Sequence, residues 1–470
     1  MIGPGEVLRE RRLTRFLTAV SVAACASAIG CGGNHEGATS SSNAAARAAL
    51  TGEHACARIR GFECAWLSVP LDHASASSGR LRLLVGMQLV ARAPRGVLLF
   101  LTGGPGQPGV RFIPRVRARL GAALAGYRLV MIDQRGTGAG ALRCPELQAA
   151  AGSSDLVAPP PGSIAACAHS IGPKRRFFTT AETVADLDQL RAALGAQRLT
   201  LDGVSYGTFV AERYALTHPE HVARLVLDSV VPQRGVDPLF LASIQATPRV
   251  LRSACAQSRC GRDPARDLAA IVRSHHDGSQ LLNAIVAESI VDPSLRGVLA
   301  ALKLGATGNM RPIGALLAGV RTGESVPAGV LSQGLHESTL CLDLRPPWRP
   351  QASVAERAAF VAQQSAALSA QAVFPFDRAT VQTNGSACAQ WPATTPPPAG
   401  DGDPSHPLPR VPVLLLAGER DLSTPLAWAR EETAAAPRGQ LEVVPATGHS
   451  IQTRSHDPHV LAVLVRFLRG

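Results

Sequence analysis

The sequence predicts an α/β fold, with a mostly parallel, doubly wound sheet and a large, mainly helical insertion. Residues 128–132 and 222–227 are continuous apolar runs, which are typical of parallel strands covered by helices on both faces. Helical stretches such as 183–194 and 426–435 alternate with these runs, which is the α/β pattern. A length of 470 residues, 46% of them hydrophobic, is enough for a sizeable core.

The N-terminal segment resembles a targeting signal. Four arginines between residues 9 and 15 precede the apolar stretch 16–30, so we expect a secretory signal peptide over residues 1–30. Lipoprotein-type cleavage could occur before Cys25 or Cys31, and cleavage before Cys31 keeps the fuller apolar stretch. We favour a lipid anchor on Cys31 over simple secretion, with 31–55 as a polar tether. Both routes place the mature chain outside the cytoplasm, in the cell envelope or the medium.

The first part of the predicted core, residues 56–231, contains an early strand that ends in a glycine-rich turn. The strand spans 95–101, and Gly103 and Gly104 follow it directly. Backbone N–H groups of such a turn can approach an anion closely. A phosphate-binding loop is excluded, because no Lys-Ser/Thr pair closes the turn and Pro105 lacks an N–H donor. We therefore assign Gly103 and Gly104 to an oxyanion hole.

The pentapeptide 203–207 has the form Gly-x-Ser-x-Gly and follows the apolar run 199–201. A helical stretch, 208–217, comes next, so Ser205 is expected on a sharp strand-to-helix turn with its hydroxyl exposed. The N–H of Tyr206, the next residue, is then the second oxyanion donor. The motif alone is common among loops, but its place between a strand and a helix makes Ser205 a candidate nucleophile.

Residues 232–408 break the alternation of strands and helices. Helical segments at 263–274 and 352–368 lie in this stretch, which ends in a proline-rich linker at 392–409. An insertion of this size, placed after the strand that follows the nucleophile helix, is expected to form a lid over the serine.

The C-terminal part, residues 409–470, supplies a carboxylate and a histidine at strand ends. The apolar strand 411–417 leads to Asp421, and the strand 441–444 leads to His449. Serine, aspartate and histidine thus follow in the chain order of an α/β hydrolase. We predict Ser205 as the nucleophile, His449 as general base and then acid, and Asp421 as the group that orients the imidazole.

Other residues compete for two of these roles. Asp228 ends an earlier strand and is an alternative acid, whereas Asp202 would sit beside the nucleophile and reach His449 poorly. His456 and His459 lie beyond His449 but follow no strand, so they rank below it.

These motifs together resemble the α/β-hydrolase peptidases related to prolyl aminopeptidase. The resemblance is strongest to the secreted bacterial tripeptidyl aminopeptidase group with its TAP-like C-terminal region. The matching segments are 103–106, 133–138, 185–191, 203–208, 226–231, 421–425 and 448–449. Departures occur at Thr102, where relatives usually carry His or Pro, and at 107–108 and 138–140. The resemblance implies that lid carboxylates hold the free amine of a substrate, with Glu337 and Asp343 as the candidates here.

Eight cysteines follow Cys31, an even number that favours disulfides in an exported chain. Sequence alone leaves the connectivity open, and we expect sequential pairing. The expected pairs are Cys56–Cys64, Cys144–Cys167, Cys255–Cys260 and Cys341–Cys388. No C-x-x-C pair occurs, which argues against a zinc or redox site.

The net charge of +12 indicates no particular partner. The arginines are scattered and aromatic residues make up only 4% of the chain, so nucleic-acid binding is not expected. The sequence predicts an exported serine hydrolase, with an aminopeptidase as the first choice for its activity. The alternative is an esterase or amidase acting on small acyl groups. A catalytically silent binding protein is disfavoured because all parts of the site are present. No cofactor and no metal ion are expected, and the oligomeric state is left open.

Overall fold

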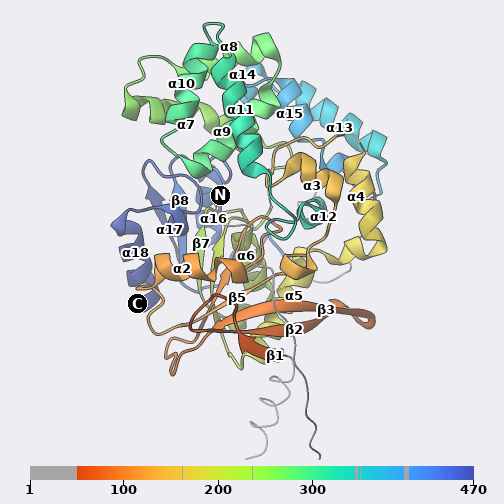
Figure 1. The fold of residues 1–470 in the computed structure, drawn as a ribbon, viewed down its shortest axis with the longest axis vertical. Helices are drawn as coiled ribbons and strands as arrows, with labels where there is room; N and C mark the ends of the chain where they lie inside the picture. Colours follow the sequence, from red (N-terminus) through yellow and green to blue (C-terminus); the bar gives the residue numbers. More distant parts are fainter. Residues whose placement is uncertain (1–49, 161, 236, 344–347, 350, 396–401) are drawn as a thin grey trace, which may run out of the picture.

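Residues 50–470 of the computed structural model are described here, apart from 161, 236, 344–347, 350 and 396–401. The predicted signal peptide, Cys31 and most of the predicted tether therefore lie outside the described residues. Figure 1 shows the two main parts of the molecule: a sheet with its helices, and above it a group of helices. No helix among the described residues has the length and apolar character needed to cross a bilayer.

One nine-stranded sheet runs through the lower part, in the order β1-β2-β3-β5-β4-β6-β7-β8-β9. The first three strands are antiparallel, and β3 pairs antiparallel with β5; every pair from β5 to β9 is parallel. The strands are β1 (Leu50–Ala55), β2 (Phe62–Asp72), β3 (Ser75–Gln88), β4 (Val97–Leu101), β5 (Arg128–Ile132), β6 (Leu199–Val204), β7 (Val222–Asp228), β8 (Val413–Gly418) and β9 (Gly439–Val444). The predicted fold class is confirmed.

The predicted tether is too long at its C-terminal end. Leu50 pairs with Leu67 and Ala55 with Glu63, so residues 50–55 form an edge strand of the sheet. The Cys56–Cys64 disulfide closes this hairpin directly after the strand. Backbone pairing and a covalent bond therefore hold a segment whose polar composition alone predicted a linker.

Helices cover both faces of the sheet, as its apolar strands require. Apolar side chains of α5 (Thr180–Ala193), α6 (Tyr206–Thr217) and α16 (Leu426–Ala435) share one buried cluster with the strands. On the opposite face, α2 (Ile113–Leu120) and α18 (Pro458–Arg469) belong to a second cluster. The core strands β4 and β8 are buried along their whole length, which explains their continuous apolar sequences.

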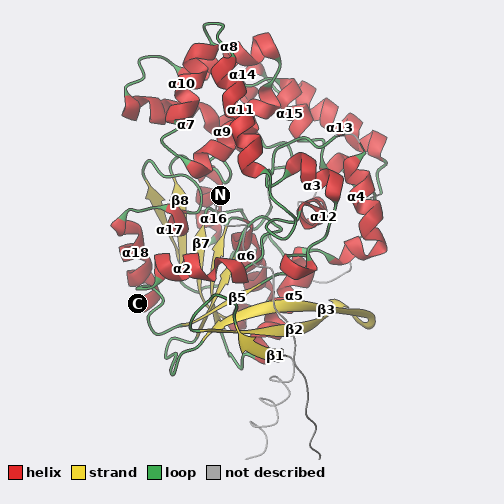
Figure 2. Ribbon diagram, viewed as in Figure 1, coloured by secondary structure: helices red, strands yellow, loops and turns green. Residues whose placement is uncertain are grey.

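The stretch between β7 and β8 is helical throughout its regular structure, as Figure 2 shows. Its α-helices are α7 (Leu241–Ser258), α8 (Pro264–His275), α9 (Gly278–Val291), α10 (Arg296–Gly305), α11 (Arg311–Glu324), α12 (Gln333–Asp343), α13 (Val354–Ala367), α14 (Ala370–Val373) and α15 (Arg378–Asn384). Leu251, Leu282 and Leu302 belong to a buried cluster formed mainly by these helices. The lid therefore has a hydrophobic core separate from that of the sheet.

The four disulfides join the cysteines in the predicted sequential order. Cys144–Cys167 connects α3 (Pro145–Ala151) to α4 (Ser163–Ile171), two helices that precede α5. Cys341–Cys388 connects α12 to the short 3-10 helix η5 (Cys388–Gln390) of the lid. Each pair has a Cα–Cα distance of about 5 Å, which is ordinary for a disulfide.

Candidate active site

Ser205 lies on a sharp turn between β6 and α6, with φ 57° and ψ −128°. L-residues rarely adopt this backbone, and it turns the serine side chain out of the strand end. The turn packs closely against the end of β4: a Cβ on Gly207 would lie 2.4 Å from Leu101 O, and one on Gly103 would lie 2.8 Å from Ser205 Cβ. The two flanking motifs therefore need glycine where the strands and the turn meet.

Asp421 and His449 meet at the ends of β8 and β9. His449 Nδ1 lies 2.9 Å from Asp421 Oδ2, and both residues are buried. The backbone N–H groups of Ser423 and Thr424 each donate to Asp421 Oδ1 over 2.9 Å. Thr424 Oγ1 donates to Asp421 Oδ2 over 2.7 Å and also lies 3.3 Å from His449 Nδ1. These donors fix the orientation of the Asp421 carboxylate. Because the carboxylate binds Nδ1 of His449, Nε2 of the imidazole points away from Asp421.

The electrostatics of the pair favour a charged carboxylate. Burial by itself would raise the pKa of Asp421, but the charge and hydrogen bond of His449 and the bonds from Thr424 hold it below its ordinary value. Burial lowers the pKa of His449, yet the Asp421 carboxylate more than compensates and leaves it raised. An imidazolium formed during a reaction is therefore stabilised at this position.

Asp228, the alternative acid, makes no hydrogen bond to the imidazole. Its carboxylate accepts the backbone N–H groups of Ile451 and Gln452, over 3.0 and 2.9 Å, just after His449. Its backbone oxygen accepts the N–H of Ser205 over 2.9 Å. Asp228 thus connects the nucleophile turn to the histidine loop. Burial raises its pKa to about 6.

Ser205 opens into a cavity between the sheet and the lid that, with the solvent at its mouth included, holds about 680 Å³ of empty space. Its walls are mainly apolar, and they include Phe240 and Val286 from the lid and Trp428 from α16. Ser205 Oγ has no hydrogen bond to any described residue. Contacts between a catalytic serine and its base often tighten only when a substrate is bound.

The glycine-rich turn lies against the nucleophile, as an oxyanion loop must. Gly104, Pro105 and Tyr206 line the same cavity as Ser205. The backbone N–H of Gly104 has no acceptor among the described residues. A donor without an acceptor beside the serine is what binding of a developing oxyanion requires.

The two predicted lid carboxylates differ in position. Asp343, at the end of α12, lines the cavity of Ser205, but its Oδ2 accepts two hydrogen bonds from Thr180. Glu337 is buried and lines a second cavity. Burial raises the pKa of Glu337, while the charge of His336 lowers it.

Sequence reasoning missed Asp155, which lines both cavities. Its side chain keeps 39% of its surface accessible, because it faces the open space between sheet and lid. The surrounding protein raises the pKa of the carboxyl by desolvation, and the charges of His336 and His449 lower it. Asp155 lies between α3 and α4 in no recognisable motif, so only the fold reveals its place beside Ser205.

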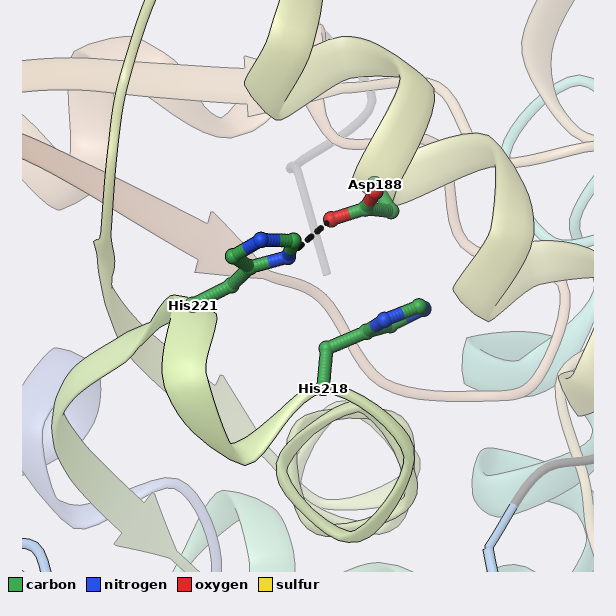
Figure 3. A group of neighbouring side chains, drawn as sticks. All are labelled: Asp188, His218 and His221. Carbon is green, nitrogen blue, oxygen red and sulfur yellow. Dashed lines mark hydrogen bonds and ion pairs between the residues drawn. The ribbon is translucent and has the colours of Figure 1, made fainter.

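A separate cluster joins Asp188 on α5 to His218 and His221, which flank the turn before β7 (Figure 3). His221 Nδ1 lies 2.8 Å from Asp188 Oδ1. The same oxygen accepts from Arg191 Nε over 2.7 Å and from Tyr214 Oη over 2.8 Å. Because these donors already engage the carboxylate, the cluster fits a hydrogen-bonded link between α5 and α6 better than a metal site.

Two family models match the chain. Residues 96–283 match the alpha/beta hydrolase fold, and residues 373–470 match the TAP-like protein model. The first segment ends within the lid, and the second contains β8, β9, Asp421 and His449.

Three curated relatives illustrate the similarity. Tripeptidyl aminopeptidase of Streptomyces coelicolor is 34% identical over 221 residues, 42% of this chain and 40% of the relative. A probable proline iminopeptidase of the same organism is 37% identical over 136 residues, 29% of this chain and 34% of the relative. Serine protease Hip1 of Mycobacterium tuberculosis is 28% identical over 199 residues, 38% of each chain. The matched segments thus span about two fifths or less of the length of these relatives.

Proposed function

This chain is an α/β hydrolase with a TAP-like C-terminal region, and from that premise we propose that it is an exported serine aminopeptidase. It would release single residues or short peptides from substrates with a free N-terminus. The observation that carries the choice of activity is Asp155, a carboxylate that shares the cavity of Ser205. A carboxylate in a mainly apolar cavity favours a cationic group, and the ammonium of a peptide N-terminus is such a group.

The proposed reaction follows the acyl-enzyme route. Ser205 Oγ attacks the scissile carbonyl carbon while His449 Nε2 takes the hydroxyl proton. The N–H groups of Gly104 and Tyr206 stabilise the resulting oxyanion. The C–N bond then breaks, and His449 returns its proton to the leaving amine. A water molecule, deprotonated by His449, hydrolyses the ester and frees the released residue or peptide together with Ser205.

The assignment of the amine site is tested together with the activity. We would assay the mature protein on chromogenic peptides with free and with blocked N-termini, and on short acyl esters, with Ser205→Ala as the matched control. Release from free-amine peptides alone, lost in Ser205→Ala, is the expected result. The shortest good substrate would then give the number of residues released per cleavage.

Two other outcomes would replace the proposal. Ester cleavage that ignores the amine would make the protein an esterase or amidase, which the mainly apolar cavity also suits. The absence of any turnover by wild-type protein would point to a binding protein with a silent site.

Export is the other part of the proposal. The four disulfides support it, because such bonds persist in oxidising compartments. Incorporation of a labelled fatty acid that disappears in Cys31→Ala would support a lipid anchor. An unlabelled wild-type protein recovered from the medium would instead support simple secretion.

A further inference from the structure

Helix α12 lies at the boundary between the lid and the sheet domain, near α3 and α4 (Figure 1). Eight of its eleven residues are buried. Its polar side chains bond to the backbone of the sheet domain: Ser338 Oγ donates to Arg175 O over 3.0 Å, and Thr339 Oγ1 donates to Phe178 O over 2.9 Å. These bonds hold the helix in one place relative to the active site.

The N-terminal half of α12 holds the glycine-rich loop. The N–H of Ser332, just before the helix, donates to Gly106 O over 3.0 Å. His336 Nδ1 lies 3.1 Å from Pro105 O; a carbonyl oxygen only accepts, so Nδ1 carries the proton. A Cβ on Gly106 would lie 2.7 Å from Ser332 O, so the loop and the start of α12 are in close contact. Two hydrogen bonds thus fix the loop that contains the Gly104 donor.

The C-terminal end of α12 reaches the other side of the nucleophile. Asp343 Oδ2 accepts the backbone N–H of Thr180 over 2.7 Å and its hydroxyl over 2.6 Å. Thr180 Oγ1 therefore accepts in turn from the hydroxyl of Tyr206, 2.7 Å away. Tyr206 is the residue whose N–H is the second proposed oxyanion donor.

We propose that α12 sets the spacing of the two oxyanion donors, with His336 in its N-terminal half and Asp343 at its C-terminal end as positioning residues. The inference rests on the proposed serine nucleophile but not on the choice of peptide or ester as substrate. Oxyanion donors act only within a few tenths of an ångström of hydrogen-bonding distance from the oxyanion. An element that contacts both donor segments therefore controls the rate of the chemical step more than the binding of the substrate.

The two ring nitrogens of His336 provide a matched pair of variants. Nδ1 faces Pro105 O, while Nε2 lies 3.6 Å from Asp155 Oδ1. His336→Asn places an amide N–H where Nδ1 was and so keeps the bond to Pro105. His336→Gln places its amide near the position of Nε2 and loses that bond. Thr180→Val and Thr180→Ser form a second pair, because only the serine retains the hydroxyl that joins Tyr206 to Asp343.

The readouts are the rate at which a fluorophosphonate labels Ser205 and the kcat and KM for a short ester. In the labelling reaction the Oγ–P bond of Ser205 forms as the hydroxyl proton passes to His449 and fluoride leaves, and the phosphonyl oxygen occupies the oxyanion hole. We expect His336→Gln and Thr180→Val each to lower the labelling rate and kcat about 10-fold or more, with KM nearly unchanged. His336→Asn and Thr180→Ser should recover most of the loss.

The outcomes distinguish a failure of the proposed function from a failure of the inference about α12. If the wild-type protein is not labelled at Ser205 and hydrolyses none of the substrates, the proposed function fails. If the wild type is labelled and His336→Gln and Thr180→Val react at its rate, the role of α12 is overturned. A loss that the conservative variants do not recover would also overturn it, because it would reflect general damage to the fold. Should Thr180→Val unfold, Tyr206→Phe removes only the hydroxyl at the far end of the same link and carries the same prediction.

Discussion

The carboxyl ends of the parallel strands, called the sheet edge below, and the lid contribute to the site in different ways. At the sheet edge, Ser205, Asp421 and His449 follow strand ends, and main-chain N–H groups hold two of their turns in place. In the lid, Phe240 and Val286 shape the cavity, and the polar groups Glu337 and His336 depend on how helices pack. In the proposed reaction the sheet edge supplies Ser205, Asp421 and His449, whereas the lid borders the cavity and, through α12, contacts the glycine-rich loop.

The largest expected effect separates the two acids of the sheet edge. Asp421→Asn should lower kcat about 10⁴-fold, because the imidazole loses both its orientation and its stabilising charge. Asp228→Asn weakens the anchor of the histidine loop and removes a smaller contribution to the raised pKa of His449, so it should cost about 10- to 100-fold.

The pH dependence of kcat/KM checks the same assignment. Asp421 raises the pKa of His449, and the base must be neutral to act, so activity falls as the pH drops through that raised value. In Asp421→Asn the acid limb should move to lower pH. Equal losses in the two variants would contradict the division of roles between Asp421 and Asp228.

The stability of the lid should depend on its disulfides, and more on the one that closes the longer loop. Replacing Cys341 and Cys388 together by serine opens a loop of 47 residues, for which chain entropy predicts a loss of about 4 kcal/mol in unfolding free energy. The same change at Cys255 and Cys260 opens a loop of 5 residues and should cost about 2 kcal/mol. Urea denaturation under non-reducing conditions measures both. A larger loss for the shorter loop would show that strain or local packing, not loop length, decides the stability of the lid.

A buried carboxyl beside the sheet should make stability depend on pH. Burial raises the pKa of Glu432, on α16, to about 7, above its ordinary value of 4.5. The folded state binds the proton more tightly than the unfolded state does. The free energy of unfolding is therefore highest below about pH 4.5 and falls as the pH rises to about 7. The loss should approach about 3 kcal/mol.

Glu432→Gln should remove that part of the pH dependence, because glutamine keeps an acceptor for the N–H of Gln233. The exposed neighbour provides the control: Glu431→Gln should change the slope far less, because the charge of Glu431 contributes less than burial to the raised pKa of Glu432. Thermal unfolding between pH 4.5 and 8 gives the comparison. Identical slopes in wild type and Glu432→Gln would mean that the pKa of Glu432 is not raised in the folded protein.

The smallest predicted effect concerns the lid side of the cavity. Asp155→Asn should raise KM for free-amine peptides about 10- to 30-fold, the value of a charge-assisted hydrogen bond, and leave blocked esters unaffected. Glu337→Gln should matter only for substrates long enough to enter the second cavity. An equal loss on esters and peptides in Asp155→Asn would assign that residue a structural role.

The same contrast explains what could be predicted from the sequence. The strands, the turn of Ser205 and the strand-end positions of Asp421 and His449 follow from local patterns, and the structure forms these elements within a few residues of the predicted bounds. Asp155 could not be found this way, because it enters the cavity only through the packing of α12 and the lid. The hydrogen bonds of Asp343 to Thr180 join residues 163 positions apart, and no local pattern indicates such a pair.

The antiparallel strands at the N-terminal edge of the sheet were also missed, although β2 has the alternating pattern of a strand with one buried face. Its burial alternates along much of Phe62–Asp72, as expected for a strand with one face toward the core. The polar, small residues of β3 at its exposed end obscure the partner strand.

The lid leaves the sheet after β7 and returns at β8, and these two strands are direct neighbours, with Asp228 opposite Leu416. Because the two strands are parallel, the chain leaves at the C-terminal end of β7 and must return to the N-terminal end of β8, and the ladder fixes both points whatever the length of chain between them. Closing a longer loop costs little extra free energy. The parts of the insert outside α12 can thus change in length or sequence while Ser205, Asp421 and His449 keep their positions, so the specificity of the site can change without rebuilding the reacting groups.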